Sequence, residues 1–179
     1  MQESHPNVCD SRLGAALTHQ PSTEAVLGTG SPLVKGQPIR FGFSVGRLRL
    51  LLLPHTFSEV VTQAVIYPLP NVPPWFLGML NQRGNLFPVF DLHQLLHAGN
   101  RGHDNRTVLV LDQGSDAVGM LIDGMPQAIT LTQTRCQVPA LPEALKAHVP
   151  TAYAVRETVW LEFDHRGFFT TIGAQITRA

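Results

Sequence analysis

Short apolar runs recur along the chain from Phe41 onward, and residues that favour turns end each run. Phe41, Phe43 and Val45 alternate with other residues and share one face of a strand, after which Gly46-Arg47 can turn the chain into Leu48–Leu53. Further strands are expected at 57–61, 78–82, 85–91, 107–111, 117–123, 127–131 and 158–164, and short helices at 93–97 and 141–148. Short antiparallel strands with glycine-rich connections are typical of barrels, so the pattern predicts an all-β protein with a few short helices.

The pattern changes near residue 38. Every aromatic residue of the chain lies at or after Phe41, whereas residues 1–38 contain mainly small and polar residues with little to bury. A helix at Arg12–Leu17 would be too short to stand alone. We therefore expect a flexible N-terminal tail over 1–38 and a folded domain over 39–179, with docking of the tail onto a partner as the alternative.

Composition excludes several classes of protein. The 13 basic and 13 acidic side chains give no net charge, so the chain lacks the basic surface that nucleic-acid binding requires. Cys9 and Cys136 form no Cys-x-x-Cys pair, which argues against a disulfide or zinc framework. The apolar run Leu48–Pro54 is far shorter than the roughly 20 residues that span a bilayer, and no signal pattern is present at the N-terminus. A cytoplasmic protein without direct membrane insertion is expected.

Residues 66–92 are the most informative stretch. Four prolines, at 68, 70, 73 and 74, restrict the backbone that leads to Trp75. Two apolar segments then flank Arg83-Gly84, and Gly84 can adopt the positive φ that a tight reversal demands. The stretch predicts a hairpin with an arginine at its tip.

This stretch resembles the CheW-like family of bacterial chemotaxis coupling proteins. The family pattern Gly-x-x-Asn-x-Arg-Gly falls on residues 78–84, and its Val-Pro-Val-x-Asp-Leu falls on residues 87–92. The resemblance continues in Thr107–Leu111 and in the apolar run 117–124, and it covers roughly residues 39–164. It implies two small five-stranded SH3-like β-barrels packed together.

The resemblance also implies a non-catalytic adaptor without a cofactor. Such a protein couples the cytoplasmic tip of methyl-accepting chemoreceptors to the regulatory domain of a CheA-type histidine kinase, in arrays at the membrane. The family arginine corresponds to Arg83 and its glutamate to Glu59, and we expect the two to pair. Gln82 departs from the leucine often found there. The residues expected to bind partners are Glu59, Trp75, Asn81, Gln82, Arg83, Gly84 and Asn85.

Two segments depart from minimal members of the family. One is the long N-terminal extension, and the other is residues 164–172, where the family often has a short helix. These departures resemble the PilI-type proteins of type IV pilus twitching motility. Flagellar chemotaxis is the equal alternative, and gene neighbourhood would separate the two.

The rival hypothesis is a metal- or small-ligand-binding β-barrel enzyme that uses Asp91, His93 and His97. Two histidines at i and i+4 would share one face of a helix, but no motif supplies a further ligand. Asp91 and Asp123 each follow an apolar strand, so we expect both to cap local backbone N–H groups. The chain also has no Gly-x-Ser-x-Gly elbow, and the sequence supports no enzyme class.

The aromatic residues have two interpretations each. Phe76 is expected to plug the end of a barrel. Trp75 and Trp160 could serve either the core or an interface, because large aromatic side chains dominate both.

Overall fold

The computed structural model describes residues 39–99, 107–131 and 135–176. The expected tail, with its candidate helix at Arg12–Leu17, and most of the expected loop at 99–105 lie outside these residues.

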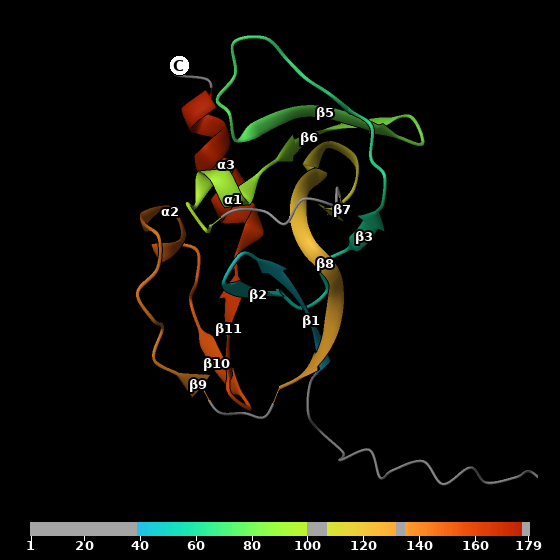
Figure 1. Ribbon diagram of the computed structural model, residues 1–179. Helices are drawn as coiled ribbons and strands as arrows, with labels where there is room; N and C mark the ends of the chain where they lie inside the picture. Colours follow the sequence, from blue (N-terminus) through green and yellow to red (C-terminus); the bar gives the residue numbers. More distant parts are fainter. Residues whose placement is uncertain (1–38, 100–106, 132–134, 177–179) are drawn as a thin grey trace, which may run out of the picture. The chain divides into compact units, whose positions relative to one another are not determined.

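The described residues form short strands and few helices, which confirms the all-β fold class (Figure 1). The strands are β1 (Ile39–Val45), β2 (Leu48–Leu52), β3 (Ser58–Val61), β4 (Ile66–Tyr67), β5 (Phe76–Gln82), β6 (Asn85–Phe90), β7 (Thr107–Leu111), β8 (Val118–Thr130), β9 (Arg135–Cys136), β10 (Ala152–Val155) and β11 (Thr158–Phe163). The helices are α1 (Leu92–Leu95), the 3₁₀ turn η1 (Gly114–Asp116), α2 (Glu143–Lys146) and α3 (His165–Ile176).

The strands fall into two subdomains. Subdomain I contains β3–β7 and the beginning of β8, and subdomain II contains β1, β2, β9–β11 and the end of β8. The strand order is β4-β5-β6-β8-β1-β2-β11-β10-β9, with β7 between β8 and β3. The hydrogen-bonded pairs within the described residues do not close either subdomain into a complete barrel.

Strand β8 runs through both subdomains, as the curved ribbon in Figure 1 shows. The expectation of separate strands at 117–123 and 127–131 was therefore wrong. Residues up to Ile122 pair with β7, and residues from Asp123 onward pair with β1. Gly124 has a φ of +69°, and the register with β1 shifts beside it, so the strand bends without ending.

Both faces of the central strands are buried. Because successive side chains of a strand point to opposite faces, neighbouring residues pack into different hydrophobic clusters. Leu109 and Leu111 of β7 pack with Leu50 and Leu52 of β2 in a layer shared by the two subdomains. Val108 and Val110 point the opposite way, into the interior of subdomain I with Leu80, Phe87, Val89 and Leu121. A run of consecutive apolar residues such as 108–111 is thus explained by two-sided burial.

The interior of subdomain II contains Trp160, packed with Leu51, Ile129 and Leu131. Its ring lies so close to Gly42 that a Cβ there would collide with it. Trp160 is therefore a core residue, and Phe76, only 9 % exposed, confirms the expected core role.

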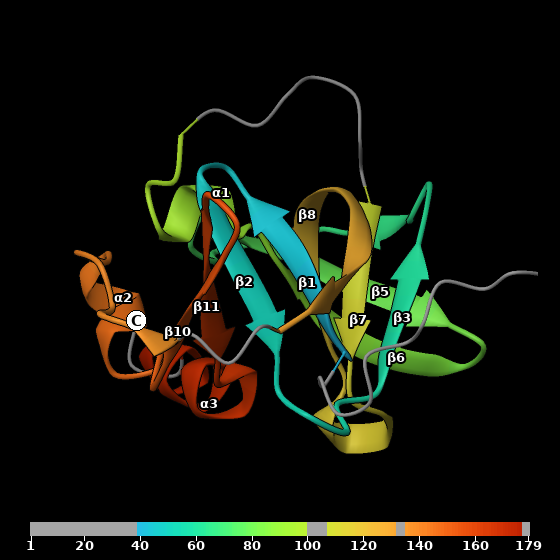
Figure 2. The same ribbon diagram turned by 90° about the horizontal axis from the view of Figure 1, so that it is seen from below.

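Helix α3 corrects the expectation that residues 164–172 lack the family's C-terminal helix. Asp164 Oδ1 accepts the N–H of Gly167 at 3.1 Å, which caps the first turn. Phe168 and Ile172, one turn apart, are buried, and Phe168 makes edge contacts with Phe163 and Phe169 (Figure 2 shows the helix beside β11). Tertiary packing outweighs the poor helix propensity of Gly167, Thr170 and Thr171.

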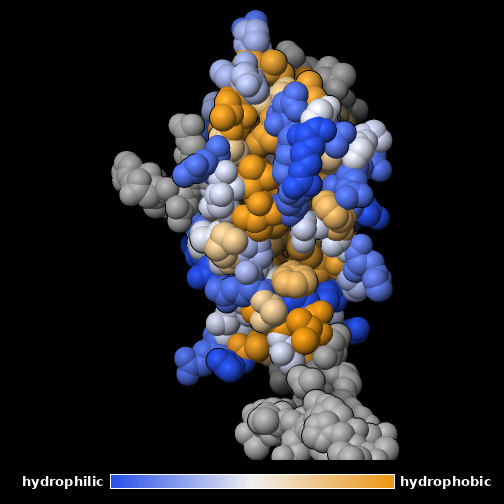
Figure 3. Space-filling view, turned by 90° about the vertical axis from the view of Figure 1, so that its right-hand side faces the viewer, coloured by the Kyte–Doolittle hydropathy of each residue, from blue (hydrophilic) through white to orange (hydrophobic). Residues whose placement is uncertain are grey.

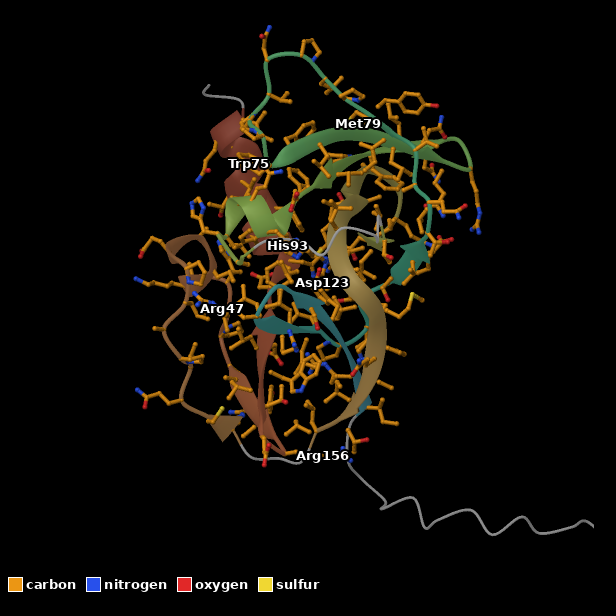
Figure 4. All side chains as sticks on the ribbon, viewed as in Figure 1. Arg47, Trp75, Met79, His93, Asp123 and Arg156 are labelled. Atoms are coloured by element: carbon orange, nitrogen blue, oxygen red, sulfur yellow. The ribbon has the colours of Figure 1, made fainter. Side chains whose placement is uncertain are left out.

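A polar network joins the subdomains where α1 meets the β1–β2 turn. Asp91 caps α1, as expected, by accepting the N–H of His93 at 3.0 Å. Asp123 was expected to cap local N–H groups and does not. Its Oδ2 accepts the N–H of Gly46 at 2.6 Å, and both its carboxylate oxygens lie 3.0 Å from His93 Nε2 (Figure 4).

The carboxylates on either side favour the charged form of His93. Asp91, with its Oδ1 3.4 Å from Nδ1, raises the pKa of this buried histidine, and Asp123 acts in the same direction against the effect of burial. At 3.4 Å the Asp91 attraction is largely electrostatic. Because a protonated Nε2 donates to Asp123, the N–H of Gly46 also depends on Asp123 as its acceptor.

We expect Asp123→Asn to lower the free energy of unfolding by about 1–3 kcal/mol at pH 6, because it removes the charge that faces His93. A raised pKa in the folded state contributes stability that is complete below the ordinary value of 6.5 and is lost as the pH rises through the folded value. The difference between wild type and variant in urea denaturation should therefore shrink at alkaline pH. A difference that is constant from pH 5 to pH 9 would contradict the charged pair.

Candidate functional site

The β5–β6 hairpin has the predicted arginine at its tip. Arg83 and Gly84 are the two turn residues between the paired Gln82 and Asn85, with φ values of +52° and +83°. Two consecutive positive φ values define the turn type that suits the twist of a hairpin. Asn81 Oδ1 accepts the N–H of Gly84 at 3.2 Å and fastens the turn, so this part of the prediction is confirmed.

Glu59 of β3 holds the tip from the side. Its Oε1 lies 3.1 Å from Arg83 Nη2 and accepts a hydrogen bond from Gln82 Nε2 at 2.8 Å. The expected pair of Glu59 and Arg83 is thus present, and Gln82, the departure from the family pattern, is part of it. The Arg83 side chain remains 79 % exposed, so the pair orients the guanidinium and contributes little stability.

A hollow of about 330 Å³ opens beside this tip. Glu59, Gln82, Arg83 and Asn85 form its polar side, and the apolar part is supplied by Phe57, Phe87, Val110 and Ala117. Phe57 is 44 % exposed and belongs to the exposed large apolar side chains of the described residues. Figure 3 shows the face with β3 and this tip, where apolar side chains gather in a band between hydrophilic ones.

The lining of the hollow includes Asp112, a buried carboxylate in an ionic group that sequence reasoning missed. Asp112, 8 % exposed, accepts hydrogen bonds from Arg166 Nε at 2.8 Å and Arg166 Nη2 at 2.7 Å. His165 Nε2 lies 2.9 Å from the same carboxylate. The arginine bonds, helped by His165 and opposed by burial, lower the pKa of Asp112 to about 2. Since Asp112 and His165 are 53 residues apart, no local pattern pointed to this group.

Trp75 lies away from the hairpin tip, at the opposite end of β5 (Figure 4). Its ring stacks on Phe90 with centroids 6.1 Å apart, and Phe90 in turn contacts Phe169 of α3. Its main-chain carbonyl accepts the N–H of Asp91 at 2.7 Å. The structure therefore does not bring Trp75 together with the other expected binding residues, and its binding role stays a prediction.

The histidines of the rival hypothesis are not on a common helical face. Helix α1 ends at Leu95, so His97 is outside it, exposed and with a φ of +49°, whereas His93 is buried. Within the described residues, no group of three or more histidine, cysteine, aspartate or glutamate side chains is arranged to hold a metal ion. Among the helices in the described part of the chain, none combines the length and apolar character that crossing a lipid bilayer requires.

Comparison with known proteins identifies the family. A sequence model of the CheW-like domain matches residues 41–172, and the chain therefore belongs to the CheW-like domain family.

Its relatives include the protein FrzA of Myxococcus xanthus, 34 % identical over 46 % of this chain, which spans 52 % of FrzA. The chemotaxis protein CheW of Helicobacter pylori is 28 % identical over 64 % of this chain and 68 % of its own length. The protein PilI of Pseudomonas aeruginosa is 29 % identical over 71 % of this chain and 76 % of its own length.

Among solved structures, the scaffolding protein TtCheW of Thermoanaerobacter tengcongensis superposes with a TM-score of 0.62. The match covers 75 % of this chain and 93 % of that protein at 19 % identity. This likeness confirms the CheW-like fold expected from the sequence, with its two packed SH3-like subdomains.

We expect Asp112→Asn to lower the free energy of unfolding by about 2 kcal/mol at pH 7, the equivalent of moving the pKa from 3.8 to about 2. A lowered pKa contributes stability that is complete above the ordinary value and is lost as the pH falls toward 2. Urea denaturation of wild type and variant should therefore converge between pH 4 and pH 2. Glu143→Gln, in an exposed pair with Lys146, is the matched control without this effect. Parallel curves for wild type and Asp112→Asn would contradict the assignment.

Proposed function

We propose that this protein is a non-catalytic adaptor that couples methyl-accepting chemoreceptors to a CheA-type histidine kinase. The observation that carries the proposal is the hairpin tip of subdomain I. Arg83 is exposed, oriented by Glu59 and placed beside a partly apolar hollow, in a chain that belongs to the CheW-like family. An oriented cation beside exposed apolar surface is a combination that protein interfaces favour.

The hollow supports protein binding better than catalysis. The charged groups of its lining already have partners, since Arg83 pairs with Glu59 and Asp112 pairs with Arg166 of α3. The low pKa of Asp112 keeps this carboxylate ionised, so it is a poor general acid or base at neutral pH. The site offers a charged rim and an apolar floor to a protein partner, here the regulatory domain of the kinase.

An adaptor of this kind needs no tight contacts. Two contacts of micromolar strength, each about 8 kcal/mol, give a firm assembly when many copies bind side by side. The protein would act in the cytoplasm, recruited to receptor arrays at the membrane. Signal passes as a coupling free energy when receptor and kinase bind the same adaptor.

The pathway is either chemotaxis or type IV pilus twitching motility. The identities of 28 % to a CheW and 29 % to a PilI do not favour one. Pilus genes next to the gene for this chain would favour twitching motility, and flagellar genes would favour chemotaxis.

We expect Arg83→Glu and Glu59→Arg each to weaken binding of the kinase regulatory domain at least tenfold, because each leaves two like charges side by side. The double variant should regain most of the affinity, since the exchanged charges can pair again. Isothermal titration calorimetry of the three variants measures this coupling. Strictly additive losses would show that the pair has no common role in binding.

Arg156→Glu is the matched control for these measurements. Arg156 is the first residue of the β10–β11 turn, is exposed and has a φ of +55°, close to that of Arg83. Arg156→Glu changes the charge by the same amount as Arg83→Glu, but at the tip of a different hairpin. Equal losses of affinity for Arg83→Glu and Arg156→Glu would point to a general charge effect and would contradict a site at the β5–β6 tip.

A further inference from the structure

A second hairpin tip presents arginine beside a hollow, this time in subdomain II. Gly46 and Arg47 are the turn residues of the β1–β2 hairpin, between the paired Val45 and Leu48. Next to this tip lies a hollow of about 370 Å³. The segment Pro139–Leu141 before α2 forms one wall, and residues 157–159 at the beginning of β11 form another.

The lining combines an apolar floor with a cationic rim. Leu48 and Leu161 lie at the floor, where β2 and β11 run parallel, and Leu141 and the 40 % exposed Val159 extend the apolar surface. The charged residues of the lining are Arg47, Arg49 and Glu157, which leave one net positive charge.

The two arginines have unused donors. Arg49 Nη1 donates to the main-chain oxygens of Gly46 at 2.9 Å and Leu48 at 3.3 Å, which leaves the N–H groups on Nε and Nη2 of this guanidinium without a partner among the described residues. Arg47 is exposed, and within the described residues its side chain makes no hydrogen bond or ion pair. This is the reverse of the subdomain I site, where Glu59 already satisfies part of Arg83.

The tip is held in place before any partner arrives. Gly46 has a φ of +55°, its N–H is bound by Asp123, and a Cβ at this position would collide with the carbonyl oxygen of Ala98. Figure 4 shows Arg47 extending outward from this tip, away from His93 and Asp123. A preformed site loses less conformational entropy on binding, which favours affinity for a partner.

We propose that this hollow is a second docking site and that it binds a peptide segment of a partner protein in which an acidic residue adjoins a leucine, isoleucine or similar side chain. The carboxylate would pair with Arg47 and Arg49, and the apolar side chain would cover Val159, Leu141 and the floor. The inference rests on the proposed adaptor function, which requires two surfaces, and it assigns the second surface to subdomain II. With β2 and β11 already paired to each other here, recognition is by side chains and not by strand addition.

The test is a selection of random twelve-residue peptides displayed on phage against the full chain. The enriched peptides should contain aspartate or glutamate next to an aliphatic residue. Arg47→Glu and Val159→Ser, both at exposed positions, should each lower the affinity for a synthetic copy of such a peptide at least tenfold, as measured by fluorescence anisotropy. Arg83→Glu should leave its affinity unchanged. The affinity should also fall as salt is raised, because the contact is between exposed charges.

Enriched peptides without acidic residues, peptides that bind Arg47→Glu as well as wild type, or no enrichment at all would each overturn the inference. Kinase regulatory-domain binding, measured on the same variants, separates this failure from that of the proposed function. If Arg83→Glu abolishes kinase binding while Arg47→Glu leaves peptide binding intact, the second site is wrong and the adaptor function stands. If instead Arg83→Glu leaves kinase binding unchanged while Arg47→Glu abolishes peptide binding, the assignment of the β5–β6 tip to kinase binding is wrong and the docking site in subdomain II stands.

Discussion

The apolar layer between the two subdomains is the interaction on which the rest of the structure depends. Leu50 and Leu52 of β2 meet Leu109 and Leu111 of β7 there, together with Met120 and Ile122 of β8, and all are nearly or fully buried. At roughly 25 cal/mol per Å² of apolar area, such burial is the largest favourable term that a domain of this size has. The layer exists because every second residue of these strands points into it while the others fill a subdomain interior. Both candidate docking sites lie at hairpins that extend from this layer.

Much of the fold could be predicted from local pattern because its signals are local. The β5–β6 hairpin followed from Arg83-Gly84 between apolar segments, and the cap of α1 followed from Asp91. The continuity of β8 and the presence of α3 could not be predicted in the same way. Gly124 is normally a sign of a turn, but here its positive φ serves a bend inside a strand. Helix α3 has poor propensity and depends on Phe168 and Ile172 reaching the core, although their spacing of four, after Asp164, was a usable signal.

The candidate site divides in the same way. The tip arginine, its turn and its partner Glu59 were predicted, because the family pattern places them at fixed positions in the sequence. The walls of the hollow were not predicted, since Phe57, Val110 and Ala117 come from three separate segments of the chain. The pairing of Asp112 with Arg166 and of Asp123 with Gly46 was also beyond the sequence, because these partners are 54 and 77 residues apart. Trp75 was expected to join the site because it is near the hairpin in sequence. It lies at the other end of β5 from the tip, so the length of this strand separates the two.

The passage of β8 through both subdomains has a mechanical consequence. Two domains joined by a linker can swivel, but here the joint is itself a hydrogen-bonded strand, paired with β7 on one side of the bend and with β1 on the other. Any rotation of one subdomain against the other would have to break hydrogen bonds between strands and open the apolar layer between the subdomains. Proteins bound to the two subdomains would therefore be held at a fixed distance and angle. A rotation imposed on one subdomain would be transmitted to the other, because the joint between them has little freedom to bend.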